Sequence, residues 1–152
     1  MNVVFLDIDG VLVSWLKMND RDENHVVKFE PNAILSLNKI TSLLNAKIVI
    51  TSTWRKTRTL EIFSKLFKER GIEAEVIGMT DELDTGRASE IQSWIDSNPV
   101  NYFIIIDDNT RGIEEFFKDD KNILKTGLFR GLDEYDFLYA KRSYENFNKK
   151  KK

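Results

Sequence analysis

The chain has 152 residues, 41% of them apolar and 11% aromatic, which is enough for one globular domain with a core and too few for two of ordinary size. Its 23 basic and 25 acidic residues leave a formal net charge of −2, so the overall charge predicts no polyanionic partner. The sequence contains no cysteine, which excludes disulfides, thiolate catalysis and cysteine-ligated zinc and fits a reducing compartment. We therefore expect a cytoplasmic protein.

The N-terminal residues carry no export or membrane signal. They run directly into an apolar stretch, residues 3–6, and then into acidic residues, with no basic leader, long apolar segment or small-residue cleavage site. We expect neither export nor membrane insertion.

Four short apolar runs, each too short for a helix and rich in β-branched or aromatic residues, predict buried strands. In chain order they are residues 3–6, 48–50, 74–77 and 102–106. A weaker fifth strand is expected at residues 123–125.

Apolar residues at helical spacing lie between these strands. They predict helices over residues 34–44 after Pro31, over 62–67 before Gly71, over 91–95 before Asn98-Pro99, and over 137–147 from about Asp133. Strands that alternate with helices indicate an α/β, three-layer, Rossmann-like fold with a mainly parallel five-stranded sheet. We expect one domain over residues 1–148, followed by a frayed, solvated lysine-rich tail at residues 149–152.

Polar residues follow three of the predicted strands, and ligands of parallel sheets bind at the carboxyl ends of strands. These polar segments are Asp7-Ile8-Asp9-Gly10, Thr51-Ser52-Thr53 and Asp107-Asp108-Asn109. Side chains in extended backbone alternate between two faces, so Asp7 and Asp9 can face the same side. The sequence therefore predicts one oxygen-rich cleft.

Four carboxylates in one cleft repel each other, so the set Asp7, Asp9, Asp107 and Asp108 makes physical sense only with a bound cation. Hard oxygen ligands without histidine or sulfur favour Mg²⁺. The hydroxyls after the second strand suit phosphate oxygens, and Arg87, which opens the third helix, supplies a guanidinium fork for the same group. This combination indicates phosphoryl transfer through a carboxylate nucleophile.

These motifs resemble those of the haloacid dehalogenase superfamily of phosphatases, across almost the whole chain. The first strand and its exit read V-V-F-L-D-I-D-G-V-L, the second reads I-V-I-T-S-T-W, and the fourth reads F-I-I-I-D-D. The resemblance implies that Asp7 is the nucleophile and that Asp9 is the general acid and base, with its backbone carbonyl on Mg²⁺. It also implies that Thr51, with Ser52 beside it, binds phosphate, and that Asp108 is a better match than Asp107 for the direct metal ligand.

A narrower resemblance, to a subgroup associated with nucleic-acid repair, rests on the segments S-T-W-R, E-I-Q-S-W-I and G-L-D. Members of the superfamily commonly carry a cap domain, but here residues 13–30 can form only a small flap. An open cleft suits a phosphate on a large substrate such as a nucleic-acid end or a phosphoprotein. The lysine tail, Trp54 and the basic residues beside it favour a nucleic-acid end, where Trp54 could stack on a base, although Trp54 could equally pack under a loop. An open cleft also admits free nucleotides and other small phosphate esters, and a neighbouring subunit could supply a lid.

Each motif also has a simpler interpretation. Asp9-Gly10 is a common turn signal, and residues 51–53 could merely cap the next helix. A calcium loop fits poorly, because its third acidic ligand and terminal glutamate are missing. A phosphate-accepting receiver module would place the acidic pair after the first strand rather than the fourth, and a silent binding module would not need both Asp7 and Asp9.

Four other residues attract attention outside the three strand-end motifs. His25, the only histidine, lies in a polar stretch and is expected at the surface. Trp94 has the helical spacing of a core residue. Arg55 and Arg58, beside Trp54, are expected on a solvated basic face.

Overall fold

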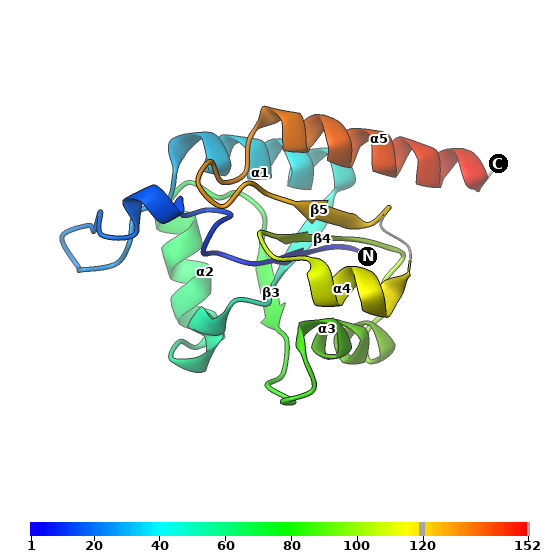
Figure 1. The fold of residues 1–152 in the computed structure, drawn as a ribbon, viewed down its shortest axis with the longest axis horizontal. Coiled ribbons are helices and arrows are strands. Elements are labelled where there is room, and N and C mark those ends of the chain that lie inside the picture. The colour runs from blue at the N-terminus through cyan, green and yellow to red at the C-terminus, as the bar shows by residue number, and fades with distance from the viewer. Residues whose placement is uncertain (119–120, 152) are drawn as a thin grey trace.

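The computed structural model of the protein describes residues 1–118 and 121–151. Within these residues, five strands form one parallel sheet in the order β3-β2-β1-β4-β5 (Figure 1). The strands are β1 (Asn2–Leu6), β2 (Ala46–Ile50), β3 (Val76–Met79), β4 (Tyr102–Asp107) and β5 (Ile123–Lys125). The expected α/β fold with a parallel five-stranded sheet is confirmed.

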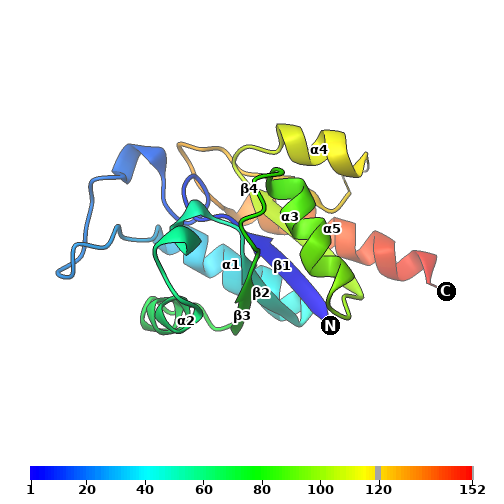
Figure 2. The ribbon, with the colours of Figure 1, turned by 90° about the horizontal axis from the view of Figure 1, so that it is seen from below.

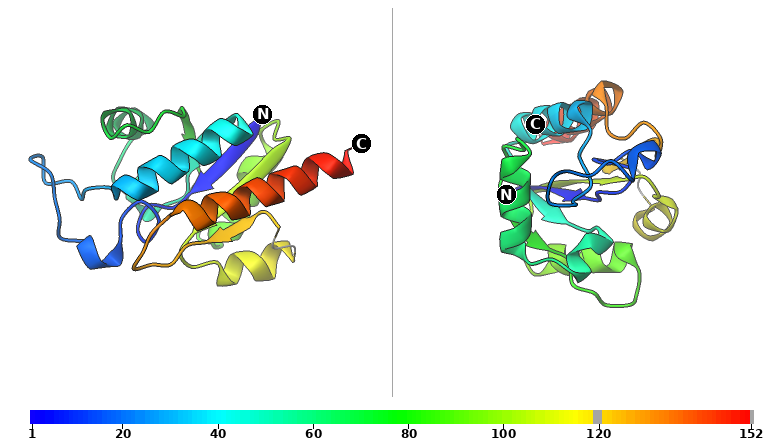
Figure 3. Two further views of the ribbon diagram at one scale, coloured as in Figure 1. Left: turned by 90° about the horizontal axis from the view of Figure 1, so that it is seen from above. Right: turned by 90° about the vertical axis from the view of Figure 1, so that its left-hand side faces the viewer.

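Helices cover both faces of the sheet (Figures 2 and 3). One face packs against α1 (Pro31–Leu44), α2 (Leu60–Glu69) and α5 (Glu134–Lys150), and the other against α3 (Arg87–Asp96) and α4 (Arg111–Phe117). Along β1, Val4 and Leu6 belong to the first of these cores, and Val3 and Phe5 to the second. This alternation follows from the two-residue period of a strand, and it buries β1 on both sides.

The helix ends carry the capping residues that their sequences predict. Pro31 is the first residue of α1, where its missing N–H costs nothing, and Asn45 ends the helix in the left-handed conformation at φ 47°. A capping box starts α5, because the side chains of Asp133 and Asp136 each accept a hydrogen bond from the other's backbone N–H. These local signals explain why the helix positions could be read from the sequence.

The expected position of the third strand was wrong by two residues: β3 covers Val76–Met79 instead of residues 74–77. Its pairing with β2 shifts register between Ile48 and Val49, which brings Gly78 opposite Val49. A side chain at Gly78 would crowd the Trp94 indole, 3.2 Å from the position of a Cβ. Packing of Trp94 therefore accounts for a glycine inside this strand.

The short helix α4 was not expected from the sequence. Its segment, Arg111–Phe117, has only one buried residue, Ile113, so it lacks the repeated apolar spacing that predicts a helix. The backbone there follows β4 directly and packs on α3.

The expected frayed tail is not a separate segment. Lys149 and Lys150 are exposed, as expected, but they form the last turn of α5, and Lys152 lies outside the described residues. In the described part of the chain, no helix combines the length and the apolar character that a membrane span requires.

The segment of residues 13–30 forms the expected flap, and the described residues contain no large cap domain. It includes the short 3₁₀ helix η1 (Trp15–Lys17) and projects from one end of the molecule (Figure 1). Buried Val27 and Phe29 hold its base, and an ion pair of 2.7 Å joins Asp22 to Arg70 of the residues after α2. His25, within this segment, is exposed, as expected.

Candidate active site

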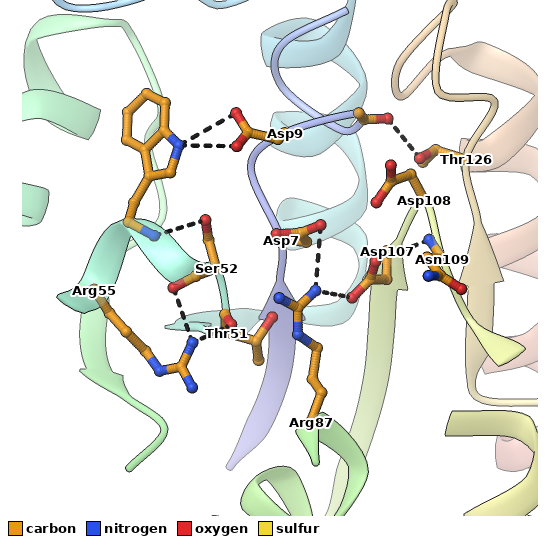
Figure 4. A network of polar contacts seen from close by, with 12 residues as sticks. Asp7, Asp9, Thr51, Ser52, Arg55, Arg87, Asp107, Asp108, Asn109 and Thr126 are labelled. Carbon is orange, nitrogen blue, oxygen red and sulfur yellow. Dashed lines mark hydrogen bonds and ion pairs between the residues drawn. The ribbon is translucent and has the colours of Figure 1, made fainter. Parts of the chain in front are cut away.

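The predicted site residues lie together at the carboxyl ends of β1, β2 and β4, which are neighbours in the sheet (Figure 4). The hydrogen-bond ladder continues one residue past the strands: Asp7 N–H donates to the Ile106 carbonyl at 3.0 Å, and Thr51 N–H donates to the Leu6 carbonyl at 2.9 Å. These bonds hold Asp7 and Thr51 in fixed register. An open cleft of about 660 Å³ lies above, and its lining includes Asp7, Asp9, Thr53, Arg87, Asp107 and Asp108.

Three of the four predicted metal-binding carboxylates converge. Asp7, Asp107 and Asp108 each offer an oxygen, and these oxygens all lie within 4.8 Å of one another. The carboxylate of Asp9 is not part of this group, because it turns towards Trp54, whose indole N–H lies 3.2 Å from both of its oxygens. Three hard oxygen donors at this spacing fit Mg²⁺, to which Asp9 would contribute through its backbone at most.

Arg87 lies beside two of these carboxylates. Gly86, at φ 99°, turns the chain into α3, so that Arg87 is the first residue of that helix. Its Nη1 lies 2.5 Å from Asp107 Oδ2 and 3.3 Å from Asp7 Oδ2. Arg87, which the sequence suggested as the basic residue of the cleft, thus lies next to the candidate nucleophile Asp7.

The electrostatics of the carboxylates call for more positive charge than Arg87 supplies. Burial and then the neighbouring Asp107 raise the pKa of Asp7 to about 8, against the opposing effect of Arg87. Burial likewise raises the pKa of Asp107, although Arg87 opposes it. A bound cation would favour the ionised forms of both groups, which is the state that a metal ligand or a nucleophile needs.

The turn after Asp9 needs a glycine. Gly10 has a φ of 80°, and a Cβ at this position would overlap the side chain of Asp108. Thr126, which follows β5, donates its hydroxyl to the Gly10 carbonyl at 2.7 Å. These contacts fix the turn after β1 against the residues that follow β4 and β5.

The two predicted phosphate-binding hydroxyls differ in their surroundings. Ser52 caps the 3₁₀ helix η2 (Thr53–Lys56) by accepting from Trp54 N–H at 3.2 Å, so the capping interpretation holds for this residue. Thr51 is fully buried, and its hydroxyl has no partner among the described residues. Neither side chain lines the cleft. From this segment, the hydroxyl residue that does line it is Thr53.

Arg55 is buried, which corrects the expectation that it lies on a solvated face. Its guanidinium donates to the carbonyls of Thr51 at 2.7 Å, Ser52 at 3.0 Å and Thr80 at 3.0 Å, and pairs with Glu90 at 3.0 Å. Glu90 also accepts from Leu83 N–H at 2.9 Å. Burial is tolerated because these partners take up the guanidinium's hydrogen bonds, and the network ties the Thr51–Ser52 loop to α3. Arg55 and Glu90 belong to the segments S-T-W-R and E-I-Q-S-W-I, but nothing in the sequence predicted that they pair.

Trp54 contacts Asp9 instead of facing open solvent at the rim. Besides its bond to Asp9, its ring packs against Phe29 at 6.2 Å between centroids, and the Arg58 guanidinium lies over it at 4.4 Å. Burial raises the pKa of Asp9. The hydrogen bond from Trp54 opposes this shift, and the nearby charge of Asp108 adds to it. Trp54 is thus a residue that orients Asp9.

The buried pair Arg55–Glu90 predicts a large effect on stability. We expect Glu90→Ala to lower the free energy of unfolding by about 3–5 kcal/mol, because it leaves the Arg55 charge buried without its counter-ion. The matched change is Glu69→Ala, which removes the exposed Lys65–Glu69 pair at 3.9 Å and should cost about 0–1 kcal/mol. Urea unfolding of both variants measures the difference, and equal losses would contradict the role given to the buried pair.

Comparison with known proteins identifies the family to which this chain belongs. The family model described as "HAD domain in Swiss Army Knife RNA repair proteins" matches residues 3–137. The chain belongs to this family. The match confirms the resemblance to the haloacid dehalogenase (HAD) superfamily and to a nucleic-acid repair subgroup within it. The matched residues of this HAD domain run from β1 into α5 and include all the predicted site residues. Neither the curated proteins nor the solved structures gave a match.

Proposed function

We propose that this HAD domain is a Mg²⁺-dependent phosphohydrolase that removes a phosphate from the end of a nucleic acid, through an aspartyl-phosphate on Asp7. The observation that carries the proposal is the convergence of Asp7, Asp107 and Asp108 within 4.8 Å, with Arg87 bridging two of them at the floor of an open cleft. The description of the family, which names RNA repair proteins, makes RNA the preferred nucleic acid.

Asp7, Asp107 and Asp108 would hold the cation, with Asp108 as the preferred direct ligand because Asp107 already pairs with Arg87. Bound Mg²⁺ would offset the negative charge that develops on the transferring phosphoryl group. Arg87 would contact the same group through its guanidinium. The Thr51 hydroxyl is our assignment for a phosphate oxygen, because it lacks a partner among the described residues and Figure 4 draws its side chain towards Arg87. Its side chain is buried outside the cleft lining, so this contact requires a local shift when the substrate binds.

The reaction has two steps. An oxygen of Asp7 attacks phosphorus, and the bond from phosphorus to the leaving oxygen breaks while Asp9 donates its proton to that oxygen. Asp9 then takes a proton from a water molecule, whose oxygen attacks phosphorus and breaks the bond to Asp7. Inorganic phosphate leaves, Asp7 is regenerated, and Asp9 is protonated again. The raised pKa of Asp9 suits a group that must carry a proton at the start of the cycle.

The open cleft supports a large substrate, because the described residues include a flap but no cap domain to close over a small one. Two features expected to favour a polynucleotide, Trp54 and the C-terminal lysines, do not line the cleft. Trp54 is engaged with Asp9, and the lysines at the end of α5 lie beside Lys121 and Asn122, which precede β5. The lysines are therefore at the opposite end of the sheet from Asp7.

The proposal is tested by phosphate release from an RNA oligonucleotide phosphorylated at its 3′ or 5′ end. We expect activity with Mg²⁺, its loss in EDTA, and recovery when Mg²⁺ is restored, with Ca²⁺ a poor substitute because it is larger and binds in looser geometry. Asp108→Ala should raise the Mg²⁺ requirement more than Asp107→Ala. Full activity in EDTA would contradict the metal assignment.

The same assay separates the two substrate classes. We expect kcat/KM for the oligonucleotide to exceed that for the matching mononucleotide and to decrease with salt, because contacts to further phosphates release counterions. An equal or higher value for the mononucleotide, independent of salt, would favour a nucleotide phosphatase. A phosphorylated Asp7 that forms but never turns over would instead favour a receiver-like module.

A further inference from the structure

Two half-exposed aromatic side chains lie on the same cleft as the candidate nucleophile. Trp15 of η1 is 49% exposed and Phe116 of α4 is 47% exposed, and both line the cleft with Asp7, Arg87 and Asp108. Single exposed aromatic residues are common on protein surfaces, but two on one polar cleft, beside a candidate nucleophile, offer an apolar surface that a planar ligand can cover.

Trp15 is held by both its backbone and its indole. Its backbone N–H donates to the Leu128 carbonyl at 3.0 Å, and the preceding Ser14 donates its hydroxyl to the Phe129 carbonyl at 2.5 Å. The indole N–H donates to Asp108 Oδ2 at 3.1 Å. The ring is thus tethered at one edge to a carboxylate of the proposed metal group, while about half of the residue stays open to solvent.

Phe116 is supported from behind by other rings. Its ring meets Phe117 at 5.0 Å between centroids in an edge-to-face arrangement, and Phe117 packs in turn on Phe103 of β4 at 5.9 Å. This support limits the motion of the Phe116 side chain. A ring that is already oriented loses little conformational entropy when a planar ligand stacks on it.

We propose that Trp15 and Phe116 form a stacking subsite for the nucleobase of the terminal nucleotide, the one that carries the phosphate to be removed. The inference rests on the proposed function, since it assigns the part of the substrate next to the phosphate. Stacking on an aromatic ring is available to every base, so the subsite would recognise the presence of a base rather than its identity.

The third aromatic near the site does not compete for this role. Trp54 uses its N–H for Asp9 and has Phe29 and Arg58 against its ring. Other exposed aromatic residues, such as Phe129 at 62%, lie outside the cleft lining. They serve as controls for exposure alone.

The test compares two RNA oligonucleotides that differ only at the terminal nucleotide, which carries the phosphate and has either a base or an abasic ribose. We expect the wild-type kcat/KM to be about 5- to 150-fold higher with the base, the factor that one stacked base supplies. Trp15→Ala and Phe116→Ala should each bring this ratio at least several-fold closer to one. Oligonucleotides phosphorylated at the 3′ and at the 5′ end are tested separately, to show which end the subsite serves.

Trp15→Phe separates stacking from the bond to Asp108. It keeps an aromatic ring and loses the N–H, so the preference for a terminal base should largely remain even if the overall rate decreases. Phe129→Ala and Leu16→Ala, which remove exposed apolar side chains outside the cleft lining, should leave the ratio unchanged. Dissociation constants of the Asp7→Asn protein for the two oligonucleotides should show the same preference without any chemistry.

Two outcomes overturn the subsite. One is a wild-type ratio near one, and the other is a ratio that Trp15→Ala and Phe116→Ala leave at the wild-type value. Turnover of p-nitrophenyl phosphate by the same preparations distinguishes a failure of the subsite from a failure of the proposed phosphatase activity. If that ester is hydrolysed while the ratio is one, only the subsite fails; if no phosphate ester is hydrolysed, the proposed function fails with it.

Discussion

Asp7→Asn is expected to abolish phosphate release, with a loss of about 10⁴- to 10⁶-fold, as for removal of a covalent nucleophile in other enzymes. The carboxamide lacks the charge and nucleophilicity of the carboxylate, and it sits where Asp7 now faces Arg87 at 3.3 Å. Phosphate release from p-nitrophenyl phosphate and from an end-phosphorylated oligonucleotide measures the effect. The matched change Asp96→Asn, at the exposed end of α3, should leave both rates unchanged.

A stability measurement would distinguish such a loss from a folding defect. Because the pKa of Asp7 is raised from 3.8 to about 8 in the metal-free fold, the folded state binds this proton more tightly than the unfolded state does. The favourable contribution is complete below about pH 4 and is lost as the pH rises through about 8. Asp7→Asn removes this dependence and should be at least as stable as the wild type at pH 8 without metal. Wild-type turnover by Asp7→Asn or Asp7→Ala would refute the covalent mechanism.

Asp9→Asn is expected to reduce turnover by about 10²- to 10⁴-fold, the usual contribution of a general acid and base. The effect should depend on the leaving group. With p-nitrophenyl phosphate, whose leaving group needs little protonation, the first step continues while the hydrolysis step lacks its base. Phosphorylated Asp7 should then accumulate, and intact-protein mass spectrometry after acid quenching would detect the added phosphoryl group.

The control for this experiment is Trp54→Phe, which removes the indole N–H that lies 3.2 Å from both Asp9 oxygens but leaves the carboxylate in place. We expect a smaller loss than for Asp9→Asn and no accumulated phosphoprotein, because the acid and base is still present. If Asp9→Asn retained wild-type turnover, or lost activity equally with every leaving group and formed no adduct, Asp9 would not be the acid and base.

Much of the fold and the place of the site could be predicted from local sequence patterns. The apolar runs that became β1, β2 and β4 are buried on both faces, so their composition alone marks them as strands, and the residues directly after them must lie at one edge of a parallel sheet. For the same reason the sequence alone groups Asp7, Thr51, Asp107 and Asp108 at one site. Gly86 and Pro31 mark helix starts through backbone chemistry that is equally local.

The partners of individual side chains could not be predicted, because they come from distant parts of the chain. Arg55 reads as a surface residue beside Lys56 and Arg58, yet Glu90 and three backbone carbonyls make its burial favourable. Trp54 and Trp15 each follow a serine or threonine in the sequence, but contacts to Asp9 and Phe29 hold the first ring partly buried against the core while the second stays half-exposed on the cleft. Which side chains are buried, and which partners they contact, depends on how the helices pack on the sheet. That packing is a property of the whole folded molecule and not of any one segment.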